Sequence, residues 1–366
     1  MTRAAEAAVE RLDVSAYTIP TDGPESDGTL AWDSTTIIVV EAHGAGRTGL
    51  GYTYGSDAVA GLITGKLADL VRGANILAPQ RTWAAMRRAL RNAGQPGVGA
   101  MAVSAVDVAL HDLRARLLEI PLSAALGAFR DAVPIYGSGG FTSYSHERLC
   151  EQLGGWAAEG IPRVKMKVGR HPEQDPGRIA AVREAVGPDV ELMVDANGAF
   201  NPTEASAWAE RYAAADVRYL EEPVTSDDPD GMRRVRDDAP AGLAIAAGEY
   251  AWSLYDVERL LAAEAVDIAQ ADVTRCGGLT ELVRIDGLCK ARSLPFSAHC
   301  APALSAHAGC AMETLIHLEY FHDHVRIENL LFDGVTQPSG GVLRPDPSVA
   351  GTGLELKRVD AERFRV

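Results

Sequence analysis

The sequence lacks any run of apolar residues long enough to cross a bilayer. In 366 residues there is no stretch of about 18 apolar residues, so we expect no transmembrane helix. Residues 1–13 are rich in alanine and charge and contain no apolar core, so we expect no signal peptide either. Both absences predict a cytoplasmic location.

Cysteine is scarce, and its distribution excludes two classes of small stabilised domain. The five cysteines are scattered and odd in number, which does not suit a disulfide framework, and their spacing is unlike that of a zinc site. They are Cys150, Cys276, Cys289, Cys300 and Cys310. We therefore expect free thiols in a reducing compartment.

Positive charge is in deficit. The 35 Lys and Arg residues are outnumbered by 50 Asp and Glu residues, and the net charge of −15 argues against nucleic acids and anionic membranes as partners. A hydrophobic content of 47% is ample for a core. Because the chain exceeds the size at which one core usually stops growing, we expect a large α/β barrel and a smaller domain.

The first part of the chain, residues 1–126, has the pattern of an α+β domain. Residues 35–41 predict a strand, and the apolar spacing of residues 102–117 predicts a helix. Residues 20–34 are polar and rich in turn formers, with one aromatic residue, Trp32, and this composition predicts a solvated loop.

From residue 133 onward, short β-type runs alternate with helical stretches at intervals of mostly about 23 to 30 residues, the length of one strand, one helix and two loops. The runs span residues 133–140, 164–168, 192–197, 219–223, 244–249, 266–272, 295–299 and 316–321. They predict a modified TIM barrel, (β/α)7β, over residues 127–340. We expect the last run to be followed by the Gly/Pro-rich segment 334–353 rather than by a helix. The alternation of residues 354–364 favours a strand.

Two lysines lie two residues apart in the second run. Strand side chains alternate between faces, so Lys165 and Lys167 point the same way. On a buried face, two ammonium groups require anions opposite them. The alternative is an exposed edge strand whose lysines reach into water.

Every later run carries an ionisable residue at or near its carboxyl end, and in barrels of this type the active site lies at the carboxyl ends of the strands. In chain order these residues are Asp195, Glu221, Glu249, Asp272, His299 and Glu319. The first three end neighbouring strands, and three converging carboxylates require a cation, for which oxygen ligands favour Mg²⁺. Glu222 adjoins Glu221 and is an alternative ligand, because only one of the two faces the barrel.

Asp272 and His299 end consecutive strands, so the carboxylate is placed to hold the imidazole tautomer and raise its basicity. The full set suits removal of a proton from the carbon next to a carboxylate. Mg²⁺ would stabilise the resulting enediolate, Lys165 would hold the carboxylate, and Lys167 would act as a base with a lowered pKa.

These motifs resemble those of the mandelate racemase subgroup of the enolase superfamily, over nearly the whole chain. Lys165-Met166-Lys167 is similar to its K-x-K motif, and the metal ligands of the family match Asp195 in Val-Asp-Ala-Asn, Glu221 and Glu249. Asp272 and His299 match its dyad, and Glu319 matches its strand-8 glutamate.

The resemblance also implies features outside the barrel. It implies an α+β capping domain built from residues 1–126 and the returning C-terminal segment 341–366. Loops at about 16–34 and 50–60 would close over the barrel mouth, and Trp32 and Asn197 would contact substrate. Glu319 would hydrogen-bond the enediolate. Members of the family are usually homo-oligomers, often octamers.

Three functions remain open from the sequence. Most relatives with this set are acid-sugar dehydratases, and the polar segment 21–34 favours a polyhydroxy acid, so dehydration to a 2-keto-3-deoxy acid is the main prediction. A racemase or epimerase of a 2-hydroxy acid is the alternative. A catalytically inactive barrel that serves as a scaffold is the third, and the complete set of acid, base and metal groups argues against it.

Overall fold

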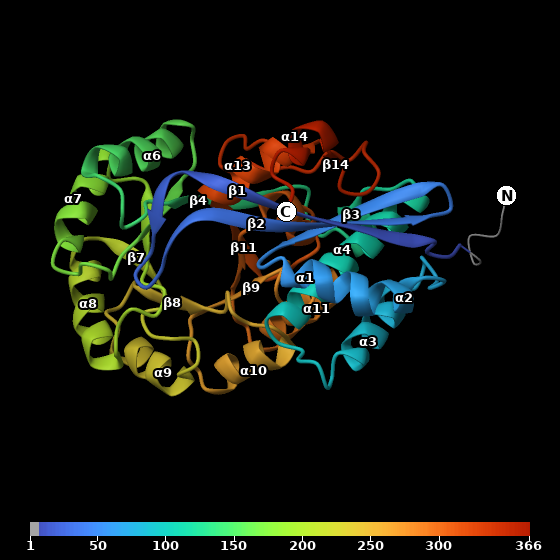
Figure 1. Ribbon diagram of the computed structural model, residues 1–366. Coiled ribbons are helices and arrows are strands. Elements are labelled where there is room, and N and C mark those ends of the chain that lie inside the picture. The colour runs from blue at the N-terminus through green and yellow to red at the C-terminus, as the bar shows by residue number, and fades with distance from the viewer. Residues whose placement is uncertain (1–6) are drawn as a thin grey trace.

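The computed structural model describes residues 7–366, so the first six residues of the segment considered as a signal peptide lie outside it. Residues 7–366 form a closed barrel of eight parallel strands beside a smaller domain with a three-stranded antiparallel sheet (Figure 1). The predicted fold, a TIM-type barrel with an α+β domain, is confirmed. Within this range no helix is both long and apolar enough to cross a membrane.

The barrel strands follow one another in chain order, and the last strand pairs with the first to close the cylinder. Each of the eight predicted runs overlaps one of these strands. The strands are β4 (Val133–Gly139), β5 (Arg163–Lys167), β6 (Glu191–Asp195), β7 (Val217–Glu221), β8 (Ala244–Ala247), β9 (Ile268–Asp272), β10 (Phe296–His299) and β11 (Leu315–Phe321).

A helix follows every barrel strand and covers the outside of the cylinder. These helices are α6 (His146–Ala158), α7 (Asp175–Val186), α8 (Pro202–Ala214), α9 (Pro229–Asp238), α10 (Leu254–Ala262), α11 (Leu279–Ala291), α12 (Pro302–Cys310) and α13 (His322–Leu331). The expectation that no helix follows the last strand was wrong, because α13 starts directly after β11. Its first turn is polar, which hid the helical spacing, but Ile327 and Leu331 are fully buried four residues apart.

The smaller domain, which we call the cap, begins with its sheet and continues with helices. Its elements are β1 (Arg11–Ser26), β2 (Ala31–Gly44), β3 (Arg47–Tyr54), α1 (Ala58–Leu62), the π-helical turn η2 (Ile63–Leu67), α2 (Ala68–Val71), α3 (Pro79–Ala89), α4 (Val98–Leu117) and α5 (Leu122–Leu126). The long β1–β2 hairpin reaches from the cap across the barrel (Figure 1).

The segment predicted as a solvated loop, residues 20–34, is mostly strand. Glu25 pairs with Trp32 and Ser26 with Ala31, after a bulge that follows Pro20. Only the tip turns, where the Asp27 carboxylate accepts the backbone N–H groups of the two residues before Ala31, each at 2.6 Å. Pairing across the hairpin satisfies the backbone of this polar segment, which is why turn-type residues are tolerated there. Residues 50–60 are likewise the end of β3 and the start of α1 rather than a loop.

Helix α4 lies directly against β3, and two glycines make this approach possible. A Cβ added at Gly49 would lie 2.2 Å from the backbone nitrogen of Leu113, and one at Gly51 would lie 2.3 Å from the carbonyl oxygen of Ala105. Both distances are far below van der Waals contact, so larger residues at these positions would push the helix off the sheet.

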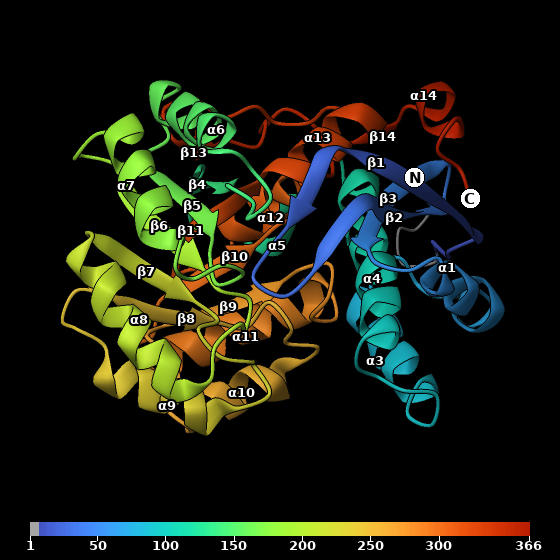
Figure 2. The same cartoon turned by 60° about the vertical axis from the view of Figure 1, so that its left-hand side comes forward.

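The C-terminal segment contacts both domains. Strand β13 (Val342–Leu343) pairs with β4, and β14 (Glu355–Leu356) pairs with β12 (Phe332–Asp333). Beyond them the chain forms helix α14 (Arg358–Glu362) and ends beside β1, where the backbone N–H of Thr18 donates to Phe364 at 2.8 Å (Figure 2). The strand expected over residues 354–364 is therefore limited to two residues.

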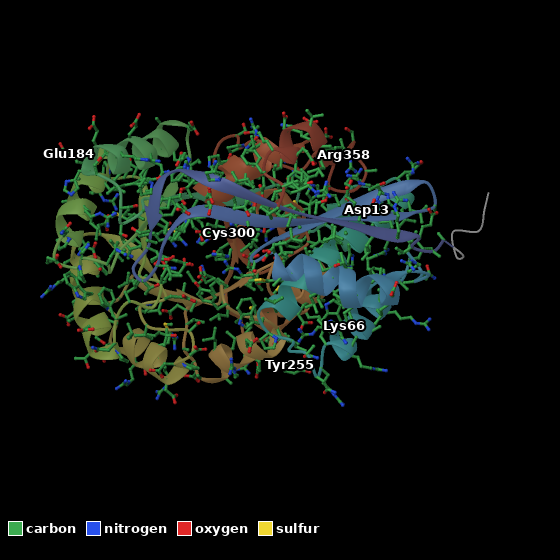
Figure 3. All side chains as sticks on the ribbon, viewed as in Figure 1. Asp13, Lys66, Glu184, Tyr255, Cys300 and Arg358 are labelled. Atoms are coloured by element: carbon green, nitrogen blue, oxygen red, sulfur yellow. The ribbon has the colours of Figure 1, made fainter. Side chains whose placement is uncertain are left out.

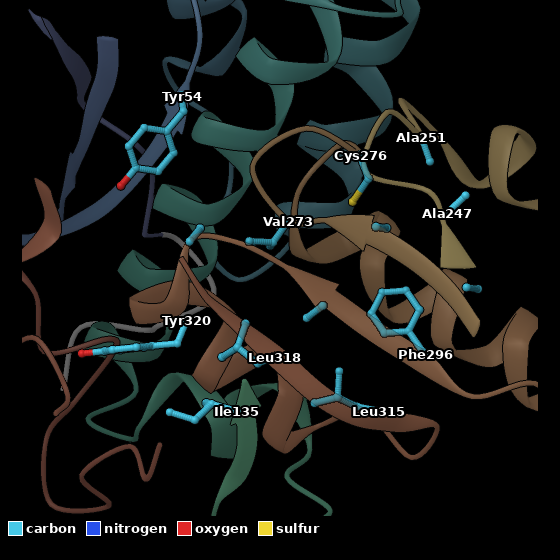
Figure 4. Close-up of a cluster of buried hydrophobic side chains, with 14 of the residues drawn as sticks. Tyr54, Ile135, Ala247, Ala251, Val273, Cys276, Phe296, Leu315, Leu318 and Tyr320 are labelled. Carbon is cyan, nitrogen blue, oxygen red and sulfur yellow. The ribbon is translucent and has the colours of Figure 1, made fainter. Parts of the chain in front are cut away.

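The barrel and part of the cap share one apolar core. Figure 4 shows part of it, with Ile135 and Leu318 on the paired strands β4 and β11, and Phe296 on β10. Tyr54 of β3 belongs to the same cluster. The core thus holds the last strand of the cap sheet against the barrel.

Candidate active site

The strand register brings the ionisable strand ends side by side. Lys167 on β5 is the direct neighbour of Asp195 on β6, and Asp195 is the neighbour of Glu221 on β7. His299 on β10 is paired in the same way with Asp272 on β9. Because these residues are direct neighbours at the carboxyl ends of parallel strands, they lie together at one rim of the barrel.

Both lysines of β5 point into the barrel, and the alternative of an exposed edge strand is excluded. Lys165 is fully buried, and its Nζ lies 2.6 Å from Glu221 and 2.8 Å from Glu319. The Nζ of Lys167 lies 2.5 Å from Asp195. Each buried ammonium group thus has a carboxylate partner, which is the condition for its burial.

The protein groups around Lys167 act on its pKa in opposite directions. Burial alone would lower the pKa of this ammonium group, but the carboxylate of Asp195 outweighs burial, so the pKa is raised. The predicted fall of this pKa was for a site that also holds a metal ion, so it stays a prediction. A divalent cation on Asp195 would counter the attraction between this carboxylate and the lysine proton.

Three carboxylates meet beside the lysines. Ligand oxygens of Asp195, Glu221 and Glu249 lie within 4.8 Å of one another, and all three side chains are buried. Burial raises the pKa of Glu221 to about 7, partly offset by Lys165, and its Oε1 accepts no hydrogen bond from residues 7–366. An all-oxygen set of converging, incompletely satisfied carboxylates fits Mg²⁺. Glu222 lies outside this set of three.

His299 is held by a carboxylate on each ring nitrogen. Its Nδ1–H donates to Asp272 at 2.8 Å, and its Nε2 lies 2.8 Å from Glu249. Burial lowers the pKa of His299, but Cys300, Glu249 and the other acids around it outweigh burial and raise the pKa well above its usual value. The Asp272–His299 pair therefore has the geometry of the predicted dyad.

Glu319 lies on β11. This strand lies between the strands of His299 (β10) and Lys167 (β5) along the shorter way around the barrel. Its Oε1 receives a hydrogen bond from Ser138 at 2.6 Å and contacts Lys165, while its Oε2 receives the backbone N–H of Cys300 at 3.3 Å. Burial raises the pKa of Glu319, but Lys165 and His299 outweigh burial and lower it well below its usual value. Glu319 is therefore an anion fixed in place by several donors.

A cavity of about 450 Å³ opens above these groups. Lys167, Glu249, His299 and Glu319 form part of its barrel side. The two residues predicted to contact substrate, Asn197 and Trp32, also line it.

The two predicted substrate contacts differ in how they are held. Asn197 follows β6 with a left-handed backbone, at φ 45°, and its buried Oδ1 has no hydrogen-bond partner among the described residues. Trp32 is on the cap, where its Nε1–H donates to Glu25 at 2.8 Å and its ring packs edge-on against Phe141. Asn197 thus has a free acceptor, whereas the polar group of Trp32 is already satisfied by the cap.

Several cavity residues were not found from the sequence. Arg275 lies three residues after the end of β9, and Cys300 comes directly after β10. Their closeness in sequence to Asp272 and His299 was the only available signal. Tyr54 and Thr35 come from the cap, and no local pattern places them at the barrel mouth. Tyr54 and Thr35 reach the site only because the cap sheet packs over the barrel.

Comparison with known proteins gives the same family for both domains. Residues 20–127 match the sequence profile of the mandelate racemase / muconate lactonizing enzyme N-terminal domain. Residues 148–361 match the profile of the enolase C-terminal domain-like family. Together the two profiles span most of the chain.

Curated relatives differ in the reaction that they catalyse. The chain is 30% identical over 361 residues to 3,6-anhydro-alpha-L-galactonate cycloisomerase of Streptomyces coelicolor, covering 96% of this chain and 98% of that protein. It is 31% identical over 336 residues to L-rhamnonate dehydratase of Saccharopolyspora erythraea, covering 88% of this chain and 83% of that protein.

Solved structures share the entire fold. A mandelate racemase/muconate lactonizing enzyme-like protein from Rubrobacter xylanophilus is 62% identical, with a TM-score of 0.97 over 98% of this chain and all of that one. A racemase from Streptomyces coelicolor A3(2) with bound magnesium is 30% identical, with a TM-score of 0.92 over the same shares of the two chains.

Proposed function

Because the chain belongs to the mandelate racemase / muconate lactonizing enzyme family of the enolase superfamily, we propose that it removes the proton next to the carboxylate of a sugar acid. The second half of the reaction is expulsion of the oxygen on the neighbouring carbon, most simply as water, which gives a 2-keto-3-deoxy acid. The observation that supports this proposal best is the placement of Lys167 and the Asp272–His299 pair around one set of three buried carboxylates.

The metal in this proposal is Mg²⁺, held by Asp195, Glu221 and Glu249. When bound, it supplies positive charge that lowers the energy of the doubly charged enediolate. The same three side chains are the set whose oxygens lie within 4.8 Å of one another. Relatives crystallised with magnesium support this assignment.

Lys167 and His299 are the two groups that exchange protons with substrate. They lie on β5 and β10, which are three strands apart in one direction around the barrel and five in the other. They therefore approach a bound molecule from different sides. Lys167 takes the proton from the α-carbon, and protonated His299, held by Asp272, gives a proton to the departing oxygen.

Lys165 and Glu319 hold the substrate and its enediolate. The ammonium group of Lys165 is directed at the carboxylates beside it and would bind the substrate carboxylate in the same way. Glu319 lies between the two bases, where it faces the oxygens of the enediolate. The buried Oδ1 of Asn197 offers a further acceptor for a substrate hydroxyl.

The leaving oxygen decides which reaction is observed. A free hydroxyl departs as water and makes the enzyme a dehydratase, as in L-rhamnonate dehydratase. A ring oxygen stays in the product and makes the net reaction an isomerisation, as the name of the cycloisomerase relative implies. With no leaving oxygen, His299 returns the proton to carbon and the result is racemisation, for which the two-sided placement of the bases is also suited.

The cap wall of the cavity favours a substrate with one carboxylate. Within the described chain, the cap residues that line the cavity include the acid Asp27 and no lysine or arginine. A second carboxylate at that end of the substrate would lack a cation and face an anion, so it is disfavoured. Aldonic acids and their lactones therefore fit this wall better than aldaric acids.

A substrate screen tests the proposal. Aldonic acids, aldaric acids and sugar lactones are incubated with the enzyme and Mg²⁺, and 2-keto-3-deoxy products are read with semicarbazide and by mass spectrometry. Loss of one water identifies a dehydratase, and a keto product of unchanged mass identifies a cycloisomerase. Absence of both a keto product and exchange of the α-proton in D₂O across the library would refute α-proton abstraction.

A further inference from the structure

Three potential metal ligands of different chemistry meet on the β10–β11 side of the cavity. They are the Nε2 of His299, the Sγ of Cys300 and the Oε2 of Glu319, all from buried side chains. The sulfur lies 3.4 Å from the nitrogen and 3.2 Å from the oxygen, and the nitrogen lies 3.4 Å from the oxygen. None of the three belongs to the carboxylate set assigned to Mg²⁺.

These separations are close to those of tetrahedral zinc. With bonds of about 2.3 Å to sulfur and about 2.0 Å to nitrogen and oxygen at tetrahedral angles, ligand atoms are about 3.5 Å apart for S–N and S–O and about 3.3 Å apart for N–O. Each observed distance agrees within about 0.3 Å. The triad is therefore spaced to bind one ion with little rearrangement.

The surroundings of His299 and Glu319 direct Nε2 and Oε2 toward Cys300, although Nε2 also contacts Glu249 and Oε2 also accepts the backbone N–H of Cys300. The Nδ1–H of His299 donates to Asp272, which is the carboxylate–histidine arrangement that orients the other nitrogen toward zinc. Lys165 and Ser138 occupy the Oε1 of Glu319 and leave the Oε2 toward Cys300. Cys300, labelled near the centre of the view in Figure 3, is buried but also lines the cavity, so an ion has a route to it.

We propose that His299, Cys300 and Glu319 form a second, thiophilic metal site that takes Zn²⁺ or Cd²⁺ in preference to Mg²⁺. Thiolate and imidazole ligands select zinc-like metals, whereas Mg²⁺ demands oxygen ligands, so the two sites differ in chemistry as well as in residues. On binding, the Cys300 thiol loses its proton to solvent. Glu249, which belongs to the Mg²⁺ set, lies 2.8 Å from the same Nε2 and competes with the ion for this nitrogen.

An ion at this site would occupy the imidazole nitrogen that the proposed reaction uses. Zn²⁺ would therefore act as an inhibitor that Mg²⁺ does not relieve, because the two ions use different sets of ligands. The site itself depends on no assumption about the substrate, so it can be tested by binding alone.

The test is a Cd²⁺ titration of full-length protein saturated with Mg²⁺. A thiolate ligand produces a sulfur-to-cadmium charge-transfer band in the near ultraviolet, and oxygen ligands produce none. The parent is Cys150→Ser, because Cys150 is the partly exposed cysteine of the described chain. In that background, Cys300→Ser removes the proposed sulfur ligand, and Cys289→Ser is the matched control for loss of a buried thiol.

We expect the band to saturate at one Cd²⁺ per chain in the parent and in the Cys289 control, and to vanish in Cys300→Ser. Zn²⁺ should displace Cd²⁺, and the Cys300→Ser substitution should weaken Zn²⁺ binding by at least about 100-fold. Circular dichroism establishes that each variant is folded. A band that persists in Cys300→Ser, or no band in the parent, would overturn the proposal and leave the proposed reaction untouched, because no turnover is measured.

Discussion

Replacement of Lys165 by methionine tests whether this residue is the counter-ion of the buried acids. Its Nζ lies within 2.8 Å of both Glu221 and Glu319, and the side chain is fully buried. Methionine fills most of the same volume but leaves the carboxylates uncompensated. Breaking a buried ion pair by removing one partner costs about 3–5 kcal/mol, so we expect a loss of that size in the free energy of unfolding without Mg²⁺.

The size of this loss should depend on Mg²⁺. Glu221 belongs to the proposed Mg²⁺ set, so the ion replaces part of the charge that the variant has lost. We expect Mg²⁺ to stabilise Lys165→Met by at least about 1 kcal/mol more than it stabilises the wild type, through tighter binding to the variant. Urea unfolding in EDTA and in saturating Mg²⁺ measures both quantities.

Lys290→Met is the matched control, because it removes the same charge from an exposed pair with Glu313. Such surface pairs contribute about 0–1 kcal/mol, and this one should not respond to Mg²⁺. If Lys165→Met lost no more stability than Lys290→Met, or if Mg²⁺ stabilised the two equally, Lys165 would not be the counter-ion described here.

Further expected outcomes concern the bases, the metal ligands and pH. Lys167→Ala and His299→Asn should each abolish turnover of a substrate found in the screen with the fold intact by circular dichroism, and full activity in either variant would remove that residue from the mechanism. Glu221→Gln should weaken Mg²⁺ binding in calorimetry by at least about tenfold and more than Glu222→Gln does, and the reverse order would make Glu222 the ligand. Burial raises the pKa of Glu328 from 4.5 to about 8. Between these two pKa values the folded protein keeps a proton that the unfolded chain releases, so the free energy of unfolding falls as pH rises. Glu328→Gln should reduce this fall by more than about 1 kcal/mol, measured by urea unfolding at a series of pH values. An unchanged dependence of the free energy of unfolding on pH in the variant would contradict the raised pKa.

Local patterns were sufficient for most of the barrel. A strand of period two followed by a helix is encoded within about 30 residues, so its repetition predicts the strands without knowledge of their neighbours. The exceptions lay where the pattern was weak. The polar first turn of α13 hid a helix, and the turn-forming residues of 20–34 suggested a loop where pairing with the rest of the hairpin makes a strand.

The choice between Glu221 and Glu222 shows where strand periodicity stops being informative. Alternation predicts that only one of the two faces the barrel, but not which one, because the backbone leaves strand geometry at this point. Glu222 has a φ of 38°, in the left-handed region, and Glu221 is the residue that joins Asp195. Cys300, with a φ of 49°, lies at a similar break after β10.

The sequence by itself determined the barrel, the strand ends that carry ionisable groups and the sharing of one face by Lys165 and Lys167. These features follow from local periodicity and from the rule that parallel strands end at one rim. Only the tertiary structure decided which groups touch. Closing the cylinder sets Glu319 beside Cys300 and His299, and packing of the cap places Trp32 and Tyr54 at the cavity. Such contacts join residues far apart in the chain, and they depend on the stagger and curvature of the whole barrel, which no local pattern encodes.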